Sequence, residues 1–263
     1  MITFRSNPFK FFILTLVVLF HACKKEEVLS DLIDEDVVSN SVVPSYVFKS
    51  ADANAVFLAL NAVTYKDVAV IGMQKIDVNT AVAVFYTSAG SKPFVDGGTV
   101  SCEGKALTKD TSNAYYYNPS GTDVITFSGT TEWAISGNAA NGMPLVNFSS
   151  AAPIPTYNGV FNGSLTSTVN RASDLNIALN GAVTGADSVM VSVSNGSSVV
   201  QKIVAASTNC TFTAAQLSAL TSSNGNATGI IQVAPFKIDF TINSGKKYYF
   251  VNQSSYTKLV TID

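Results

Sequence analysis

The sequence predicts an all-β protein with two tandem antiparallel β-sandwich domains. First, apolar and polar residues alternate over many short runs, which is the pattern of strands with one buried face. Second, turns containing Gly and Asn separate these runs at short intervals, as they do in β-sandwiches. Third, charged residues are only 13% of the chain, against roughly 25% in an average soluble domain. This composition favours an extracytoplasmic β-rich protein over a cytosolic enzyme.

The expected strands follow one another from residue 55 onward. Residues 81–86 are apolar on both faces and predict a central strand, whereas 175–179 and 187–193 alternate and predict half-buried strands. The other candidate strands are 55–63, 67–71, 113–117, 123–127, 131–136, 199–205, 228–233, 236–242, 247–252 and 257–262. Residues that tolerate positive φ lie between strands, and we expect turns at 96–98, 118–121, 195–196 and 243–245.

One short helix is expected at residues 214–221. Thr213 is placed to act as its N-cap, and Gln216, three residues later, completes a capping box. Phe212 and Leu217 flank the cap and predict a hydrophobic staple. Such a helix is an architectural feature and implies no chemistry.

The first 22 residues have the pattern of a secretory signal peptide. Arg5 and Lys10 make the start basic, and residues 11–20 form a nearly all-apolar run. A membrane-spanning helix needs about 20 apolar residues, so this run is too short for a permanent span. We therefore expect residues 1–22 to be removed from the mature protein.

The residues around Cys23 resemble the lipobox of bacterial lipoproteins, in which a small residue precedes a cysteine that is diacylated and becomes the new N-terminus. Ala22 and Cys23 match this motif, whereas Phe20 and His21 are larger than usual. This loose form is similar to that of Bacteroidota lipoproteins. The resemblance implies lipidation of Cys23 and contact with a membrane through the lipid, since two or more acyl chains give stable anchoring. Residues 24–27, Lys-Lys-Glu-Glu, either resemble a surface-export signal or are a solvated tether.

The chain after Cys23 divides into three expected parts. Residues 23–44 are acidic and predict a flexible tether. The proline-containing segment 149–155 predicts a boundary between sandwich domains at 45–150 and 151–263, each near the roughly 100 residues typical of such domains. The whole chain resembles Bacteroidota outer-membrane lipoproteins with immunoglobulin-like domains. That resemblance implies a position on the cell surface or on the periplasmic face of the outer membrane.

The composition also restricts the expected chemistry. His21 is the only histidine and lies in the expected signal peptide, so the mature chain would lack the usual general base and the commonest metal ligand. Two remaining cysteines cannot close an ordinary zinc site, and no phosphate-binding or calcium-binding loop is found. From Tyr46 onward 12 basic residues balance 12 acidic ones, which gives no electrostatic footprint for nucleic acid. We expect no catalytic residue, metal, cofactor or nucleic-acid partner.

Aromatic residues are the candidate ligand-binding groups. Consecutive strand residues face opposite sides, so at least one ring in each tyrosine run should point outward and be able to stack on a sugar. The candidates are Tyr115, Tyr116, Tyr117, Tyr248 and Tyr249. Alternatively these rings fill the sandwich, as we expect for Trp133, the only tryptophan.

Two further groups of residues could take part in chemistry, namely a pair of cysteines and a set of carboxylates. Cys102 and Cys210 lie in different expected domains and either form a disulfide or remain buried thiols. Carboxylates could support glycoside hydrolysis only as a pair, and the spacing of Glu103, Asp123 and Glu132 marks none.

Two functions fit these observations. The first is a non-catalytic binding module, with glycan as the candidate ligand, which requires accessible aromatic rings or a concave aromatic patch. The second is a structural or assembly lipoprotein that contacts other envelope proteins, which requires an apolar patch or a free sheet edge.

Overall fold

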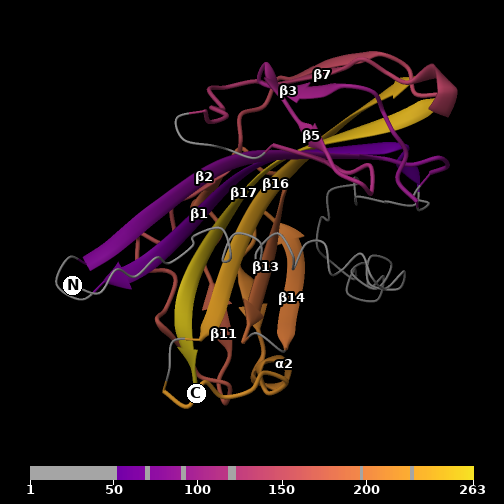
Figure 1. Cartoon of the computed structure of the whole chain (residues 1–263). Coiled ribbons are helices and arrows are strands. Elements are labelled where there is room, and N and C mark those ends of the chain that lie inside the picture. Colours follow the sequence, from indigo (N-terminus) through magenta and orange to yellow (C-terminus); the bar gives the residue numbers. More distant parts are fainter. Residues whose placement is uncertain (1–51, 69–71, 90–92, 118–122, 196–197, 226–227) are drawn as a thin grey trace, which may run out of the picture. The chain divides into compact units, whose positions relative to one another are not determined.

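The computed structural model describes residues 52–68, 72–89, 93–117, 123–195, 198–225 and 228–263 (Figure 1). The expected signal peptide, Cys23, the tether and the turn at 118–121 lie outside these ranges. The described residues belong to one compact unit. Strands predominate in it, so the all-β class predicted from the sequence is confirmed.

The largest sheet contains nine of the strands found in the described ranges. Its order is β14-β13-β16-β17-β1-β2-β6-β5, and β10 pairs with the end of β17. The long strands are β1 (Ala55–Val68), β2 (Gly72–Phe85), β16 (Gly229–Asn243) and β17 (Lys246–Ile262). The short ones are β5 (Thr108–Lys109), β6 (Tyr115–Tyr116), β10 (Thr168–Val169), β13 (Ser188–Ser194) and β14 (Val199–Ala205). Neighbours are antiparallel, except that β17 pairs in parallel with β1 and β10.

Smaller sheets and two short helices complete the described fold. A four-stranded sheet has the order β4-β3-β7-β8, from β3 (Val100–Cys102), β4 (Lys105–Ala106), β7 (Thr131–Ile135) and β8 (Val146–Ser150). Two-stranded ladders join β9 (Thr156–Tyr157) to β12 (Val183–Thr184) and β11 (Leu175–Ile177) to β15 (Cys210–Phe212). The helices are the 3₁₀ helix η4 (Ala139–Asn141) and the α-helix α2 (Ala214–Leu217).

Each of the two long C-terminal strands contains two runs that were predicted as separate strands. β16 covers the expected strands 228–233 and 236–242, and β17 covers 247–252 and 257–262. Proline has no N–H, and the ladder between β16 and β17 is interrupted at Ala234 and Pro235. The turn predicted at 243–245 is confirmed, since Ser244 and Gly245 have φ values of 53° and 74° in a two-residue hairpin loop. By contrast, residues 124–128 carry no regular secondary structure, so the strand expected at 123–127 is absent there.

The long sheet combines strands from both expected sandwich domains. β1, from segment 45–150, pairs in parallel with β17, from segment 151–263, from Ala55↔Tyr248 to Tyr65↔Lys258. Figure 1 shows β1, β2, β16 and β17 running side by side. The strands of the two segments therefore do not segregate into tandem sheets. Hydrophobic alternation indicates which face of a strand is buried but not which strand lies beside it, so the sequence pattern did not contain this pairing.

One face of the long sheet carries two separate hydrophobic cores. Alternate residues of a strand share a face. On β1, Phe57 and Ala59 belong to one core, whereas Val63 and Tyr65 belong to the other. We call the first the aromatic core; its large side chains are Phe57, Phe85, Tyr115, Tyr117, Ile125, Trp133, Ile135, Tyr248 and Phe250. We call the second the aliphatic core; it includes Ile177, Leu179, Val189, Val191, Val193, Leu217, Ile231, Val233, Val260 and Ile262.

The aromatic core is closed by the four-stranded sheet. The Phe57 ring lies 5.4 Å from Phe85, 5.2 Å from Trp133 and 4.7 Å from Phe250, measured between ring centroids. Phe148 of β8 stacks on Phe250 at 3.7 Å. Because Trp133 lies on β7 and is 2% exposed, the prediction that it fills the core is confirmed.

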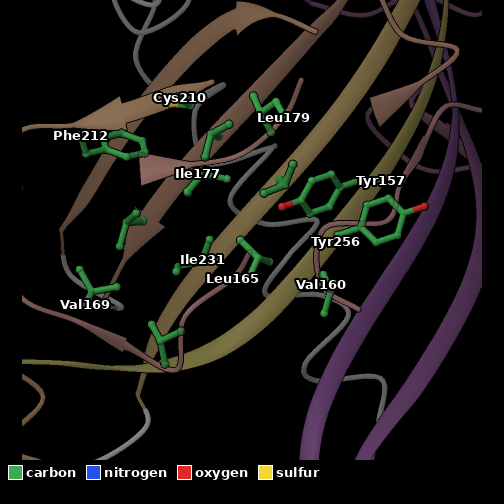
Figure 2. Close-up of a cluster of buried hydrophobic side chains, with 14 of the residues drawn as sticks. Tyr157, Val160, Leu165, Val169, Ile177, Leu179, Cys210, Phe212, Ile231 and Tyr256 are labelled. Carbon is green, nitrogen blue, oxygen red and sulfur yellow. The ribbon is translucent and has the colours of Figure 1, made fainter. Parts of the chain in front are cut away.

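The aliphatic core is closed by irregular segments, the two short ladders and α2. Figure 2 shows Ile177, Leu179 and Phe212 among the side chains that fill this core. The predicted capping box is confirmed: Gln216 N–H donates to Thr213 Oγ1 at 3.3 Å, and Thr213 N–H donates to Gln216 Oε1 at 3.1 Å. Phe212 and Leu217 are both fully buried in this core, as the staple requires. The helix ends at Leu217, four residues earlier than predicted.

Candidate binding cleft

Polar residues interrupt the shared face between the two cores. On β1 the interruption is Asn61, and on β2 it is Asp77 and Asn79. On β17 it is Asn252 and Ser254. Asn61 pairs in register with Asn79 on one side and with Ser254 on the other, so these residues form one continuous strip. We call the five residues the polar band.

A cleft of about 640 Å³ opens over the part of the polar band formed by β1 and β2. Its volume is within the range of roughly 300–1,000 Å³ that is usual for small-molecule sites. Phe127, which packs on the aromatic core, and Tyr256, which belongs to the aliphatic core, both line it. Residues 153–156, in the chain that connects the covers of the two cores, line it as well. The cleft is therefore lined by residues from both halves of the protein.

Four side chains form a hydrogen-bonded network in the cleft. Asn61 Nδ2 donates to Asp77 Oδ1 and to Asn79 Oδ1, the latter at 2.7 Å. Asn79 Nδ2 donates to the Ile125 carbonyl oxygen at 2.9 Å. Lys75 Nζ lies 2.8 Å from Asp77 Oδ2. This network holds the side chains of two neighbouring strands in fixed positions.

The network leaves donors and acceptors for a ligand. Asn61 uses both Nδ2 hydrogens, and its Oδ1 accepts no hydrogen bond from the described residues. Asn79 keeps one Nδ2 hydrogen, and each Asp77 oxygen keeps a lone pair. Donors and acceptors thus lie side by side. This arrangement suits hydroxyl groups, because each hydroxyl both donates and accepts.

Tyr256 lines the cleft on the side of the aliphatic core, and Tyr65 and Tyr157 belong to that core without lining the cleft. Figure 2 shows the Tyr256 hydroxyl turned away from the core side chains toward the strands β1 and β2, while its ring lies 5.7 Å from that of Tyr157. Tyr65 is buried, and its hydroxyl has no partner among the described residues. Burial, followed by the charges of Tyr256 and Asp77, raises the pKa of Tyr65 to about 12. Tyr65 is therefore a neutral hydroxyl donor at neutral pH.

The β17 part of the polar band is covered. Ser150 Oγ donates to Asp239 Oδ2 at 2.8 Å, and Asn252 Nδ2 donates to Ser150 Oγ at 3.3 Å and to the Ala152 carbonyl oxygen at 2.9 Å. Asn252 Oδ1 and Ser254 Oγ are buried with no protein partner among the described residues. Unpaired buried acceptors and hydroxyls of this kind usually bind ordered water.

The predicted stacking tyrosines do not gather at this cleft. Tyr115, Tyr117, Tyr248 and Tyr249 are buried, and only Tyr116 of the five, 37% exposed, reaches solvent. Tyr248 lies in the aromatic core, where burial raises its pKa to about 12. Tyr115, Tyr117 and Tyr248 lie on the face that the aromatic core covers, and Tyr116 is the outward ring of its run, as alternation predicts. Tyr249 faces away from that core but is also buried, and its hydroxyl donates to Asp52 Oδ1 at 2.7 Å.

Tyr115 has a structural partner instead of a ligand. Its hydroxyl lies 2.6 Å from Asp96 Oδ1, and Asp96 also accepts from Gly98 N at 2.8 Å and pairs with Lys109 at 2.5 Å. These bonds, with that from Lys109 the largest contribution, lower the pKa of Asp96 to about 2. The group fastens the predicted 96–98 turn to the rim of the aromatic core.

Cys102 and Cys210 are both free thiols, so a disulfide between them is not formed. Cys102 is fully buried in the aromatic core and Cys210 in the aliphatic core, which keeps them apart. Burial raises the pKa of Cys210 to about 11 and that of Cys102 further still. Neither thiol is activated as a nucleophile at neutral pH.

Two of the three acids considered for hydrolysis, Glu103 and Asp123, have local structural partners. Glu103 Oε1 accepts from the Glu132 backbone N–H at 2.7 Å, and Glu103 has a positive φ of 51°. Asp123 pairs with Lys105 at 2.5 Å on the surface. None of the three lines the cleft.

Sequence analysis missed the residues of the polar band. The available signal was a polar side chain at an inward-facing position of an otherwise apolar strand, as Asn61 is in the run Ala55–Tyr65. Such a residue interrupts a period-two pattern and looks like a strand end. Only the partner strands show that several such interruptions lie side by side.

The described ranges contain no cluster of three or more His, Cys, Asp or Glu residues able to hold a metal ion. They also contain no helix long and apolar enough to span a membrane. No protein-family model, no curated protein and no solved structure matches this chain.

Proposed function

We propose that this protein is a non-catalytic binding module and that the cleft over the polar band binds glycan. The supporting observation is the combination of an amide and carboxylate network with the rings of Phe127 and Tyr256. Sugar hydroxyls pair with amides and carboxylates, and the apolar face of a sugar ring packs on aromatic side chains. In this proposal the residues of the cleft bind the glycan, which the sequence analysis had expected of the exposed tyrosines.

Binding of the full-length protein in detergent micelles to a glycan array tests this proposal. We expect a restricted set of glycans to bind, and we expect Asn61→Ala to weaken that binding at least tenfold, about 1.4 kcal/mol. Asn176→Ala is the matched control, because Asn176 is an exposed strand asparagine bonded to Thr211 at 3.2 Å outside the cleft. Absence of binding by the folded protein, or equal losses in both variants, would overturn the proposal.

We further propose that the protein is held at the bacterial outer membrane by lipid on Cys23. The support is the resemblance of residues 20–23 to a lipobox after a signal-like apolar run. In a Bacteroidota host, labelled palmitate should enter the full-length protein and not the Cys23→Ser variant. Protease treatment of intact cells, with a periplasmic control protein, then distinguishes the cell surface from the periplasmic face.

The sandwich assignment is also a proposal at its finer level. The aromatic core lies between the long sheet and the four-stranded sheet, and this layering supports a sandwich at that core. We propose an immunoglobulin-like packing for the aromatic core alone, where a regular second sheet supplies the cover.

The second candidate function is assembly with other envelope proteins, and the edge of the long sheet favours it. β14 is the last strand at one end of the sheet order, and its Val199 and Ile203 are 54% and 46% exposed. An exposed edge strand with apolar side chains can pair with a strand of a partner. A photo-crosslinking residue at Ile203 should capture an envelope protein in cells if this function holds, and one at Leu145, which is 60% exposed and lies outside both the long sheet and the cleft, should not.

A further inference from the structure

The charges that line the cleft cancel. Lys75 is the only basic side chain and Asp77 the only acidic one among the described residues that line it. Their charged atoms are 2.8 Å apart, so each neutralises the other. An acidic ligand gains little net attraction from this pair, because a negative charge that approaches Lys75 also approaches the Asp77 carboxylate beside it.

The Asp77 carboxylate is held from both sides. Asn61 donates to Oδ1, and Lys75 pairs with Oδ2. Each carboxylate oxygen accepts about two hydrogen bonds, so one position on each oxygen remains for a ligand. Two acceptors on one planar group match two hydroxyls on neighbouring carbons of a sugar ring, and hydrogen bonds to a charged acceptor are stronger than neutral ones.

The amides beside Asp77 supply the complementary groups. The free Asn61 Oδ1 accepts from a hydroxyl, and the remaining Asn79 Nδ2 hydrogen donates to one. Both amides lie on the same face as Asp77, since Asn61 and Asn79 are register partners and Asp77 is two residues from Asn79. A ligand without charge but with adjacent hydroxyls satisfies all three side chains.

We propose that the cleft selects neutral sugars through paired hydroxyls on Asp77 and rejects acidic sugars. Asp77 is then the residue that determines specificity, and Lys75 and Asn61 position it. This inference rests on the proposed glycan-binding function.

Calorimetric titration of the full-length protein in detergent micelles tests the selection. The probes are neutral hexasaccharides of glucose, mannose, xylose and N-acetylglucosamine, and a hyaluronan hexasaccharide used with and without reduction of its carboxyl groups. We expect at least one neutral probe to bind and native hyaluronan not to bind. Binding of hyaluronan only after reduction would show that its negative charge alone prevents binding, and this result would support the selection most directly.

A charge-altering variant sharpens the test. Asp77→Asn should weaken binding of the neutral probe at least tenfold and, by releasing Lys75, should improve binding of native hyaluronan relative to wild type. Asp187→Asn is the matched control, because Asp187 also faces a lysine, Lys237, at 4.0 Å but lies outside the cleft. Its affinities should be unchanged.

The outcomes separate the two proposals. Preference for native hyaluronan over every neutral probe would overturn the selection and leave glycan binding intact, as would unchanged neutral-probe affinity in Asp77→Asn. Failure of all probes and of the glycan array, with thiol protection of Cys102 and Cys210 proving a folded protein, would overturn both.

Discussion

The two cores lie on one face of one sheet, yet they are closed in different ways. In the aromatic core, large rings from β1, β17, β7 and β8 stack between the long sheet and a regular four-stranded sheet. In the aliphatic core, branched side chains from β13, β16 and β17 meet short ladders, loops and one capped helical turn. Rings and branched side chains occur in both cores, since Tyr65, Tyr157, Phe212 and Tyr256 belong to the aliphatic core, so the two cores differ in the regularity of their covers more than in the kind of side chain that they bury.

The comparison shows how one pair of strands serves two cores. β1 and β17 run through both, and neither core contains only residues from one half of the chain. The cleft opens over the part of the polar band on β1 and β2, which neither cover closes. The candidate cleft therefore exists because two separate sets of segments cover one face of the long sheet and leave part of the polar band between them open.

The largest expected effect comes from removing one fully buried phenylalanine from either core. Phe57→Ala in the aromatic core and Phe212→Ala in the aliphatic core should each lower the free energy of unfolding by about 3–5 kcal/mol. Because β1 and β17 cross both cores, each variant should shift a single transition in guanidinium. Unfolding curves measured by fluorescence give the midpoints.

The two cysteines report each core separately in the same variants. Cys102 marks the aromatic core and Cys210 the aliphatic core. Both thiols should become reactive at the same denaturant concentration. Exposure of Cys102 alone in Phe57→Ala would instead show that the two cores unfold independently, which would restore the two-domain expectation.

A smaller effect is expected from the hydrogen bonds that cover Asn252 of the polar band. Ser150→Ala removes a buried hydroxyl that bonds Asp239 and Asn252, and should cost about 1–3 kcal/mol of unfolding free energy. Ser218→Ala, at an exposed serine that donates to the Ala215 carbonyl oxygen, is the control and should change stability by less than about 0.5 kcal/mol. Equal changes in the unfolding free energy of the two variants would mean that the Ser150 hydrogen bonds do not stabilise the region between the two cores.

The smallest expected effect is a pH dependence of the unfolding free energy that arises from Asp96, at the rim of the aromatic core. The pKa of Asp96 is lowered from 3.8 to about 2 in the folded protein, so its contribution to stability is present above pH 4 and is lost as the pH falls toward 2. The difference in unfolding free energy between wild type and Asp96→Asn should therefore shrink over that range. Urea unfolding at pH 6, 4, 3 and 2 measures it. Tyr115→Phe, which removes one donor to Asp96, should show a weaker pH dependence than wild type; an identical one would contradict the assignment.

Local features were predictable from sequence because their causes are local. The capping box of Thr213 and Gln216 spans three residues, and the hairpin turn at 243–245 depends on two residues with positive φ. Trp133 was placed correctly because an aromatic residue at an inward strand position is rarely left exposed.

Features that depend on distant residues were not predictable. The run 115–117 follows alternation, since Tyr116 is exposed, but Tyr249 is buried on the face where an outward ring was expected, because alternation within one strand does not show which distant residues cover it. The domain boundary at 149–155 was drawn from prolines, which mark non-sheet backbone but do not show that β1 leaves its own half of the chain to pair with β17.

By itself, the sequence determined the all-β class, the capped helix after Thr213, the strand faces and the near absence of histidine, since these follow from composition and short-range periodicity. Only the tertiary structure decided that the long strands are shared by two cores, that the cysteines lie apart and that Asn61, Lys75, Asp77 and Asn79 meet in one cleft. The physical reason is register: a hydrophobic pattern specifies which side of each strand is buried, and only pairing between strands decides which polar interruptions lie side by side.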